Sequence, residues 1–199
     1  MSDLSIALPS GSGERRPVLG MADFVRELVA AADRHGPGDL DGMRAAIGEP
    51  IRRLVQRDDL LDLGLPRPGN NVAESYYLYY DGELSVVLFK VPLAPAVQPH
   101  DHGVWETLFV YRGALQHTVY ERTDDGQSPG RAVLREHDSK TLNPGDYALV
   151  APPRDIHGFR ALTEGTYGIT VSRGLYNPER LYFDVEAQTC ATRRPRTLR

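Results

Sequence analysis

The hydrophobic and polar positions along the chain follow two different periods. In residues 20–34, apolar side chains such as Phe24 and Leu28 recur every three or four residues, which predicts an amphipathic helix. Two shorter helical patterns follow at residues 39–47 and 50–57. These segments together predict a helical cap that packs on a larger domain.

From about residue 75 the period changes to that of β-strands. The run SYYLYYDGELSVVLFKV holds an Asp-Gly pair between two halves rich in β-branched and aromatic residues, which is a strong signal for a hairpin. Further strand-like runs, each bounded by turn formers, lie at 107–111, 115–121, 131–136, 147–150, 158–161 and 167–172. Many short strands at regular intervals favour an antiparallel sandwich or barrel.

The composition agrees with a strand-rich domain of ordinary size. The chain has 199 residues, of which 19 are Gly and 15 are Pro, and dispersed turn formers are typical of short strands joined by tight turns. We expect a flexible N-terminal arm at 1–17, the helical cap at 18–66, the barrel at 67–186 and a basic C-terminal tail at 187–199.

Several classes of protein are excluded by composition and charge. No apolar run is long enough for a transmembrane helix, and the N-terminus lacks the pattern of a signal peptide, so we expect a cytoplasmic protein without a membrane partner. The formal net charge is −4, and neither a basic stripe nor a recognition helix is visible, which excludes nucleic acid as a partner. A single cysteine, Cys190, excludes a disulfide framework and a cysteine-based zinc site. Monomer and homodimer remain open.

The stretch QPHDHGVWETLFVYRG carries the candidate chemistry. His100, His102 and Glu106 stand in it, and residues two apart on a strand point to the same side, so His100 and His102 can present two imidazoles to one point. A turn at Gly103 lets Glu106 return toward that point. A strand and a Pro-rich turn lead to His157, the candidate third imidazole. The other histidines, among them His117 in a strand, are assigned structural or surface roles.

Three imidazoles and a carboxylate are a donor set for a first-row transition metal. Iron, nickel, manganese and copper all accept such ligands, and zinc is also possible. The residue types alone leave the choice among these metals open.

These residues resemble the cupin superfamily, whose two motifs form a small antiparallel β-barrel, the double-stranded β-helix or jelly roll, around a metal. More narrowly, residues 24–178 are similar to the cysteine dioxygenase type I branch, the thiol dioxygenases. The markers that carry this resemblance are PHDHGVW, Arg112-Gly113, Asn143-Pro144-Gly145-Asp146, Asp155-Ile156-His157 and Ser172-Arg173-Gly174-Leu175-Tyr176-Asn177-Pro178.

The resemblance implies ferrous iron, Fe(II), held by His100, His102 and His157. In that branch O2 oxidises a thiol to a sulfinic acid. Ser172 and Tyr176 match a family Ser and Tyr near the end of the barrel, and Tyr176 would donate a hydrogen bond to an oxygen species at the metal.

The chain also departs from the thiol dioxygenases. The family has His between its Ser and Tyr, where this chain has Gly174, and an Arg in the Tyr-rich stretch before the barrel, where this chain has AESYYLYY. Glu106 keeps a cupin carboxylate that thiol dioxygenases usually replace. We therefore expect Glu106 to be a fourth ligand or a base beside the metal.

The sequence therefore predicts a mainly β cupin barrel with an N-terminal α-helical cap that uses a metal and O2 to oxidise a small organic molecule. A thiol is one candidate substrate. Two alternatives remain open. One is a metal-dependent isomerase or lyase with Glu106 as the base. The other is a non-catalytic cupin that binds a metal or a small ligand.

Overall fold

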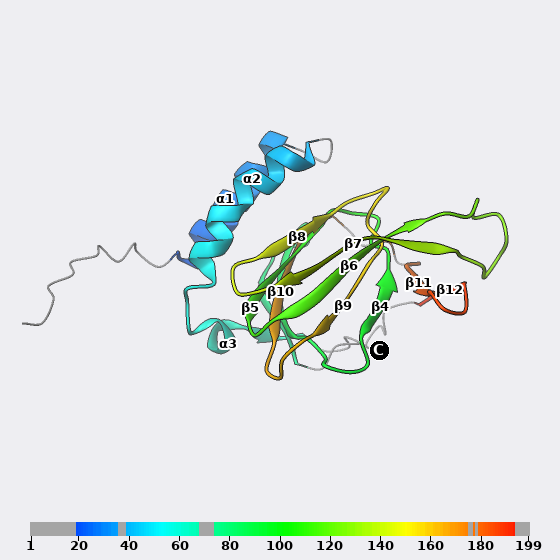
Figure 1. Cartoon of the computed structure of the whole chain (residues 1–199). Coiled ribbons are helices and arrows are strands. Elements are labelled where there is room, and N and C mark those ends of the chain that lie inside the picture. The colour runs from blue at the N-terminus through cyan, green and yellow to red at the C-terminus, as the bar shows by residue number, and fades with distance from the viewer. Residues whose placement is uncertain (1–18, 36–38, 68–73, 175–176, 178, 194–199) are drawn as a thin grey trace, which may run out of the picture.

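The fold is known from a computed structural model, which describes residues 19–35, 39–67, 74–174, 177 and 179–193. It is mainly β, with a few helices packed against one of two antiparallel sheets (Figure 1). The arm at 1–17 and the last residues of the tail, 194–199, lie outside the described residues, as does Tyr176.

In the described part of the chain, three helices precede the barrel: α1 (Met21–His35), α2 (Leu40–Leu54) and α3 (Leu60–Leu63). The prediction of two short helices at 39–47 and 50–57 is wrong, because α2 is continuous and has Pro50 in its interior. The buried residues Ile47 and Ile51 on either side of Pro50 belong to one apolar stripe, so burial of a single face stabilises both halves together.

Among the residues that the structure describes, twelve strands follow, and their bounds are β1 (Leu65–Pro66), β2 (Ser75–Tyr80), β3 (Leu84–Lys90), β4 (Val97–His100), β5 (Glu106–Arg112), β6 (Leu115–Arg122), β7 (Leu134–Leu142), β8 (Tyr147–Val150), β9 (His157–Ala161), β10 (Tyr167–Arg173), β11 (Leu181–Asp184) and β12 (Thr189–Thr192). They form two six-stranded sheets, in the orders β1-β2-β3-β10-β5-β8 and β12-β11-β4-β9-β6-β7. In the middle of each sheet, at β3-β10-β5-β8 and β11-β4-β9-β6, the neighbouring strands are distant in sequence, as in a jelly roll. The expected double-stranded β-helix is confirmed.

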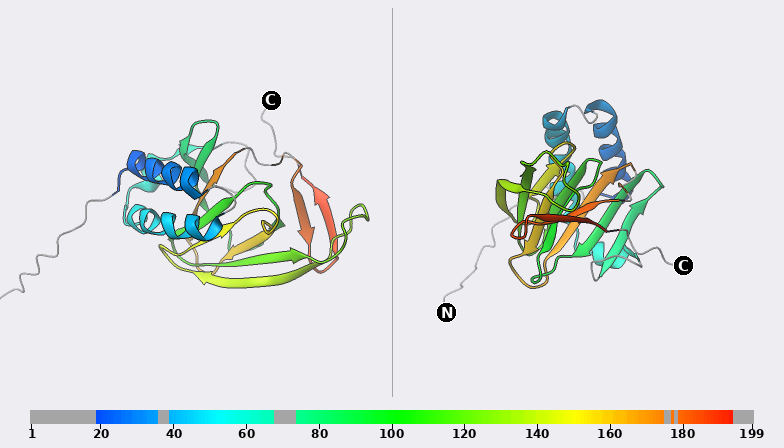
Figure 2. Two further views of the ribbon diagram at one scale, coloured as in Figure 1. Left: turned by 90° about the horizontal axis from the view of Figure 1, so that it is seen from above. Right: turned by 90° about the vertical axis from the view of Figure 1, so that its right-hand side faces the viewer.

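The first sheet is buried on both faces. Its outer face, with Leu88 and Phe109, packs against the apolar stripes of α1 and α2. Its inner face, with Phe89 and Leu108, packs against Phe159 of the second sheet. Figure 2 shows the two helices lying along one side of the barrel. The helical pair is therefore a cap on the first sheet, and the barrel interior lies between the sheets.

Two features of the second sheet differ from the predicted strands. The predicted strand at 131–136 is instead the longer β7, which begins at Leu134 and ends at Leu142. The β11–β12 hairpin has no counterpart in the sequence prediction, and β12 lies within the segment 187–199 assigned to the tail. This hairpin pairs with β4 and lies at the opposite end of the molecule from the α1–α2 pair (Figures 1 and 2). Within the described residues, no helix has the length and apolar character needed to cross a membrane.

Candidate metal centre

Three buried histidines meet at one end of the barrel interior. His100 ends β4 and is paired in the antiparallel ladder with His157, which begins β9. His102 lies two residues beyond His100, and each of the three offers a ring nitrogen within 4.8 Å of the others. All three side chains are buried. The group can therefore hold a metal ion, as predicted. The prediction that His100 and His102 share one strand is wrong, because β4 ends at His100 and His102 lies in the following loop.

The loop after β4 is fixed by a carboxylate from the other motif. Asp155 accepts hydrogen bonds from the backbone N–H groups of His102, at 3.0 Å, and Gly103, at 2.7 Å. Gly103 has a φ of +73°, a conformation that glycine adopts without strain. The predicted turn at Gly103 is confirmed, and it returns the chain to Glu106 at the start of β5.

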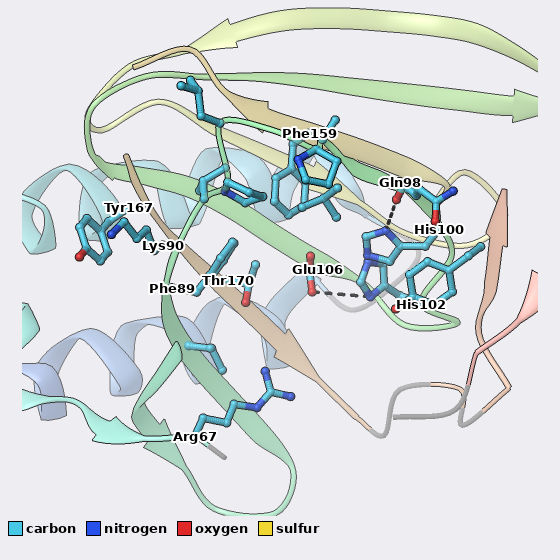
Figure 3. A pocket seen from close by; sticks show the side chains of 18 of the residues that line it. Arg67, Phe89, Lys90, Gln98, His100, His102, Glu106, Phe159, Tyr167 and Thr170 are labelled. Atoms are coloured by element: carbon cyan, nitrogen blue, oxygen red, sulfur yellow. Dashed lines mark hydrogen bonds and ion pairs between the residues drawn. The ribbon is translucent and has the colours of Figure 1, made fainter. Parts of the chain in front are cut away.

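Hydrogen bonds to the Nδ1 atoms of His100 and His157 orient these two imidazoles. His100 Nδ1 donates to the carbonyl oxygen of Gln98 at 2.8 Å (Figure 3), which leaves Nε2 of His100 with a lone pair. His157 Nδ1 lies 2.7 Å from Nε2 of His117, a buried residue on β6. When Nδ1 of His157 donates this bond, its Nε2 also keeps a lone pair. Such partners select the ligating tautomer of metal-binding histidines.

The third imidazole, that of His102, lies between an arginine and a histidine. Arg180 Nη1 is 3.3 Å from Nδ1 of His102, and Nε2 of His102 is 2.8 Å from Nε2 of His157. Two ligands at roughly 2.1 Å from one metal, at right angles, are about 3 Å apart. The separation of these two nitrogens therefore fits neighbouring ligand positions.

The imidazoles are held in the neutral form that a metal requires. Burial lowers the pKa of His100 to about 4. Burial also lowers the pKa of His102 and His157 well below the usual range, and the nearby histidines and Arg180 add to the effect. Because a metal binds the deprotonated imidazole, this environment favours metal binding at neutral pH.

Glu106 adds a carboxylate to the same point. Its Oε2 lies 3.6 Å from His102 Nδ1 and its Oε1 lies 3.5 Å from His157 Nε2. The side chain is only 4% exposed, and Figure 3 shows it directed toward the histidines. Glu106 is therefore close enough to share a metal with them or to exchange a proton with a molecule bound there.

Two further residues singled out in the sequence lie near this end of the barrel. Ser172 is buried and opposes Glu106 in the β10–β5 ladder, and its hydroxyl is 2.9 Å from that of Ser85. Gly174 has a φ of +99° and is exposed. A hydrogen bond from Tyr176 stays a prediction, because that residue lies outside the described part of the chain. A catalytic role of Ser172 also stays a prediction.

A cavity of about 1280 Å³ opens onto His100, His102 and Glu106, and His157 lies behind this lining, fully buried. Val87, Phe89 and Phe159 form much of its apolar wall, and Figure 3 shows Phe89 and Phe159 beside the space that Glu106 faces. Its cationic lining residues are Arg67, Lys90, Arg180 and Arg193.

The sequence interpretation missed these cations, and it gave His117 a structural role in a strand without relating it to His157. Three other arginines, Arg112, Arg154 and Arg173, do not line the cavity. Arg112 instead donates to the backbone oxygen of Asp58, and Arg173 pairs with Asp33.

No protein-family model and no curated protein sequence matches the chain. Solved structures with a similar fold include KdgF from Halomonas sp., with 20% identity and a TM-score of 0.37 over 50% of this chain and 78% of that one. A double-stranded β-helix protein from Klebsiella pneumoniae subsp. pneumoniae MGH 78578 has 18% identity and a TM-score of 0.39 over 59% and 84% of the two chains.

A third similar structure is hydroquinone 1,2-dioxygenase from Sphingomonas sp. TTNP3, solved with 4-hydroxybenzoate bound. It has 15% identity and a TM-score of 0.39 over 53% of this chain and 69% of that one. Similarities of this size concern the fold of part of each chain. The reaction is therefore argued below from the residues of the site.

Proposed function

We propose that this protein is a metal-dependent oxygenase that holds Fe(II) through His100, His102 and His157 and oxidises an organic substrate with O2. One observation carries the proposal: three buried, neutral imidazoles converge at the end of a cavity large enough for an organic molecule. Imidazole ligands suit iron, and three protein ligands leave coordination positions for a substrate and O2.

The residues around the proposed metal orient its ligands, exclude water and provide a carboxylate. His117 and the Gln98 carbonyl orient two ligands, and the apolar wall excludes water from the reacting atoms. Glu106 binds the metal as a fourth ligand or accepts a proton from the substrate. The bound iron supplies the activation of O2.

A thiol is one substrate for this proposal. Oxidation of RSH by one O2 gives the sulfinic acid RSO2H, with both oxygen atoms placed on sulfur and no further reductant consumed. Gly174 stands where the thiol dioxygenases have a relay histidine, and Glu106 adds a negative charge beside the histidines. Both features favour a substrate other than an anionic thiolate.

Oxygen uptake tests the proposal. Protein loaded anaerobically with Fe(II) should consume O2 when given its substrate, whereas metal-free protein and His157→Ala should not. Cysteine, 3-mercaptopropionate and apolar carboxylic acids form the first panel. Turnover of a substrate without O2 uptake would replace the oxygenase with an isomerase or lyase that uses Glu106 as its base. Tight Fe(II) binding with no turnover across the panel would favour a non-catalytic binding protein.

A further inference from the structure

Two arginines lie side by side at the histidine end of the cavity. Arg180 precedes β11 and Arg193 follows β12, and the backbone N–H of Arg193 donates to the carbonyl oxygen of Arg180 at 3.1 Å. The pairing of the hairpin therefore brings together two side chains that are 13 positions apart (193 − 180). Both side chains line the cavity.

An aromatic ring connects the two guanidinium groups to the metal centre. Arg180 Cζ lies 5.8 Å and Arg193 Cζ 5.1 Å from the centroid of the Tyr182 ring. Tyr182 stacks on His100, with ring centroids 5.2 Å apart and planes 14° apart. Arg180 also reaches His102 Nδ1 at 3.3 Å. The two positive charges thus lie beside the point at which the histidines converge.

The charges of the cavity lining favour an anionic ligand. Among the lining residues of the described chain, the carboxylates are Glu106 and Glu164, against four cationic side chains. Lys90 is paired with Glu74. At the histidine end, Arg180 and Arg193 add two guanidinium groups to the lining. Guanidinium groups bind carboxylates through paired N–H donors.

The volume and lining of the rest of the cavity favour a ligand with a large apolar portion. Ligand sites of drug-sized molecules have volumes of roughly 300–1,000 Å³, and this cavity, at about 1280 Å³, exceeds that range. Val87, Phe89 and Phe159 belong to the apolar cluster between the two sheets and also line the cavity. An acid of cysteine size would leave most of this apolar surface in contact with water.

We propose that the substrate is an apolar carboxylic acid whose carboxylate is bound by Arg180 and Arg193 and whose apolar body lies along Phe89 and Phe159. This inference names the substrate class of the proposed oxygenase and rests on that function only for the reaction, since binding of the acid requires no metal. The carboxylate anchors one end of the molecule beside the histidines, and the cavity accommodates its length.

Equilibrium binding to the metal-free, full-length protein tests this inference separately from the oxygenase proposal. Calorimetric titration at pH 7.5 with hexanoate, octanoate and decanoate should show affinity rising about tenfold for every two carbons, because each buried CH2 contributes about 0.8 kcal/mol. Decan-1-ol, which has the length of decanoate without its charge, should bind at least about tenfold more weakly than decanoate. Equal affinity for decanoate and decan-1-ol would overturn the anion site.

Variants locate the bound acid. Arg180→Gln/Arg193→Gln should weaken decanoate binding at least about tenfold and leave decan-1-ol binding unchanged, whereas Arg135→Gln, an exposed arginine of β7, should change neither. Thr170→Phe, which fills part of the cavity, should weaken both ligands. Unchanged decanoate binding in the double variant, or cysteine binding as tight as that of decanoate, would overturn the proposal. If a variant does not fold, the comparison of decanoate with decan-1-ol in the wild-type protein still tests whether the carboxylate contributes to binding.

Discussion

His117 and His157 lie on adjacent strands, β6 and β9, and their rings meet through a 2.7 Å contact between Nε2 of His117 and Nδ1 of His157. Both side chains are buried, so no solvent competes for this hydrogen bond. His157 is thereby held with one nitrogen toward β6 and the other toward His102. Under the proposed function, His117 is a positioning residue for the candidate metal centre, although it is not one of the three grouped histidines.

Replacement of His117 should weaken metal binding. His117→Phe removes the acceptor for Nδ1 of His157, and loss of such a partner typically costs 10- to 100-fold in metal affinity. His117→Gln, which keeps an acceptor, should recover part of this loss. Competition titrations with Co(II) measure the affinity, and His137→Gln, an exposed histidine of β7, is the matched control. Equal affinity in the Phe variant and in wild type would contradict the positioning role.

Replacement of Glu106 should separate ligation from proton transfer. Glu106→Gln keeps the shape of the side chain but removes its charge beside His102 and His157. If the carboxylate is a ligand, Co(II) affinity should fall at least about tenfold, and the visible spectrum of the Co(II) protein should shift. An unchanged spectrum combined with a lost reaction would assign Glu106 as a base alone.

The metal-free protein should lose stability as the pH falls from about 6.5 to about 4. Burial lowers the pKa of His100 and of His117 to about 4 in the folded protein, whereas an unfolded histidine titrates near 6.5. Between these values the unfolded state binds more protons, so the free energy of unfolding decreases with falling pH. Each of the two contributes up to about 3 kcal/mol over this window.

Urea unfolding at several pH values measures this dependence. His117→Phe removes one of these titrating groups and should flatten the slope, whereas His137→Gln, on the surface, should leave it as in wild type. A free energy of unfolding that is constant across this pH range would contradict the burial of neutral histidines in the metal-free protein.

Truncation of Phe109 should uncouple the helical cap from the barrel. Phe109 is fully buried on the outer face of the first sheet, and its ring centroid is 6.2 Å from that of Phe24 in α1. Phe109→Ala should lower the free energy of unfolding by about 3–5 kcal/mol. Leu65→Ala, at a side chain that is 71% exposed, should change it by less than about 1 kcal/mol. Chemical denaturation followed by circular dichroism compares the two.

Local sequence predicted most of the barrel and the three clustered histidines. The period-two runs and the Asp-Gly turn correspond to β2 and β3, and the run at 147–150 corresponds to β8. His100 and His102 are close in sequence, and the strand order brings His157 beside them through pairing with β4. Runs of β-branched and aromatic residues bounded by turn formers were sufficient to predict these strands, although β3 is buried on both faces and does not alternate.

The residues that surround the histidines depend on contacts between distant segments. His117 meets His157 across 40 positions, and Arg180 meets His102 across 78. Neither contact can be predicted from the local sequence, because the pattern around a histidine does not show which distant residue its side chain will contact. The β11–β12 hairpin was missed for a similar reason, because strands as short as these carry little periodic signal.

The β11–β12 hairpin and the histidines come from different parts of the chain. The three histidines lie on β4, on β9 and in the loop after β4, whereas both arginines flank the hairpin, which joins the second sheet through β4. Tyr182 of the hairpin stacks on His100, and Arg180 reaches His102. The hairpin therefore couples the cavity wall to the orientation of the histidines, and an engineer who grafts a different hairpin has to keep these two contacts.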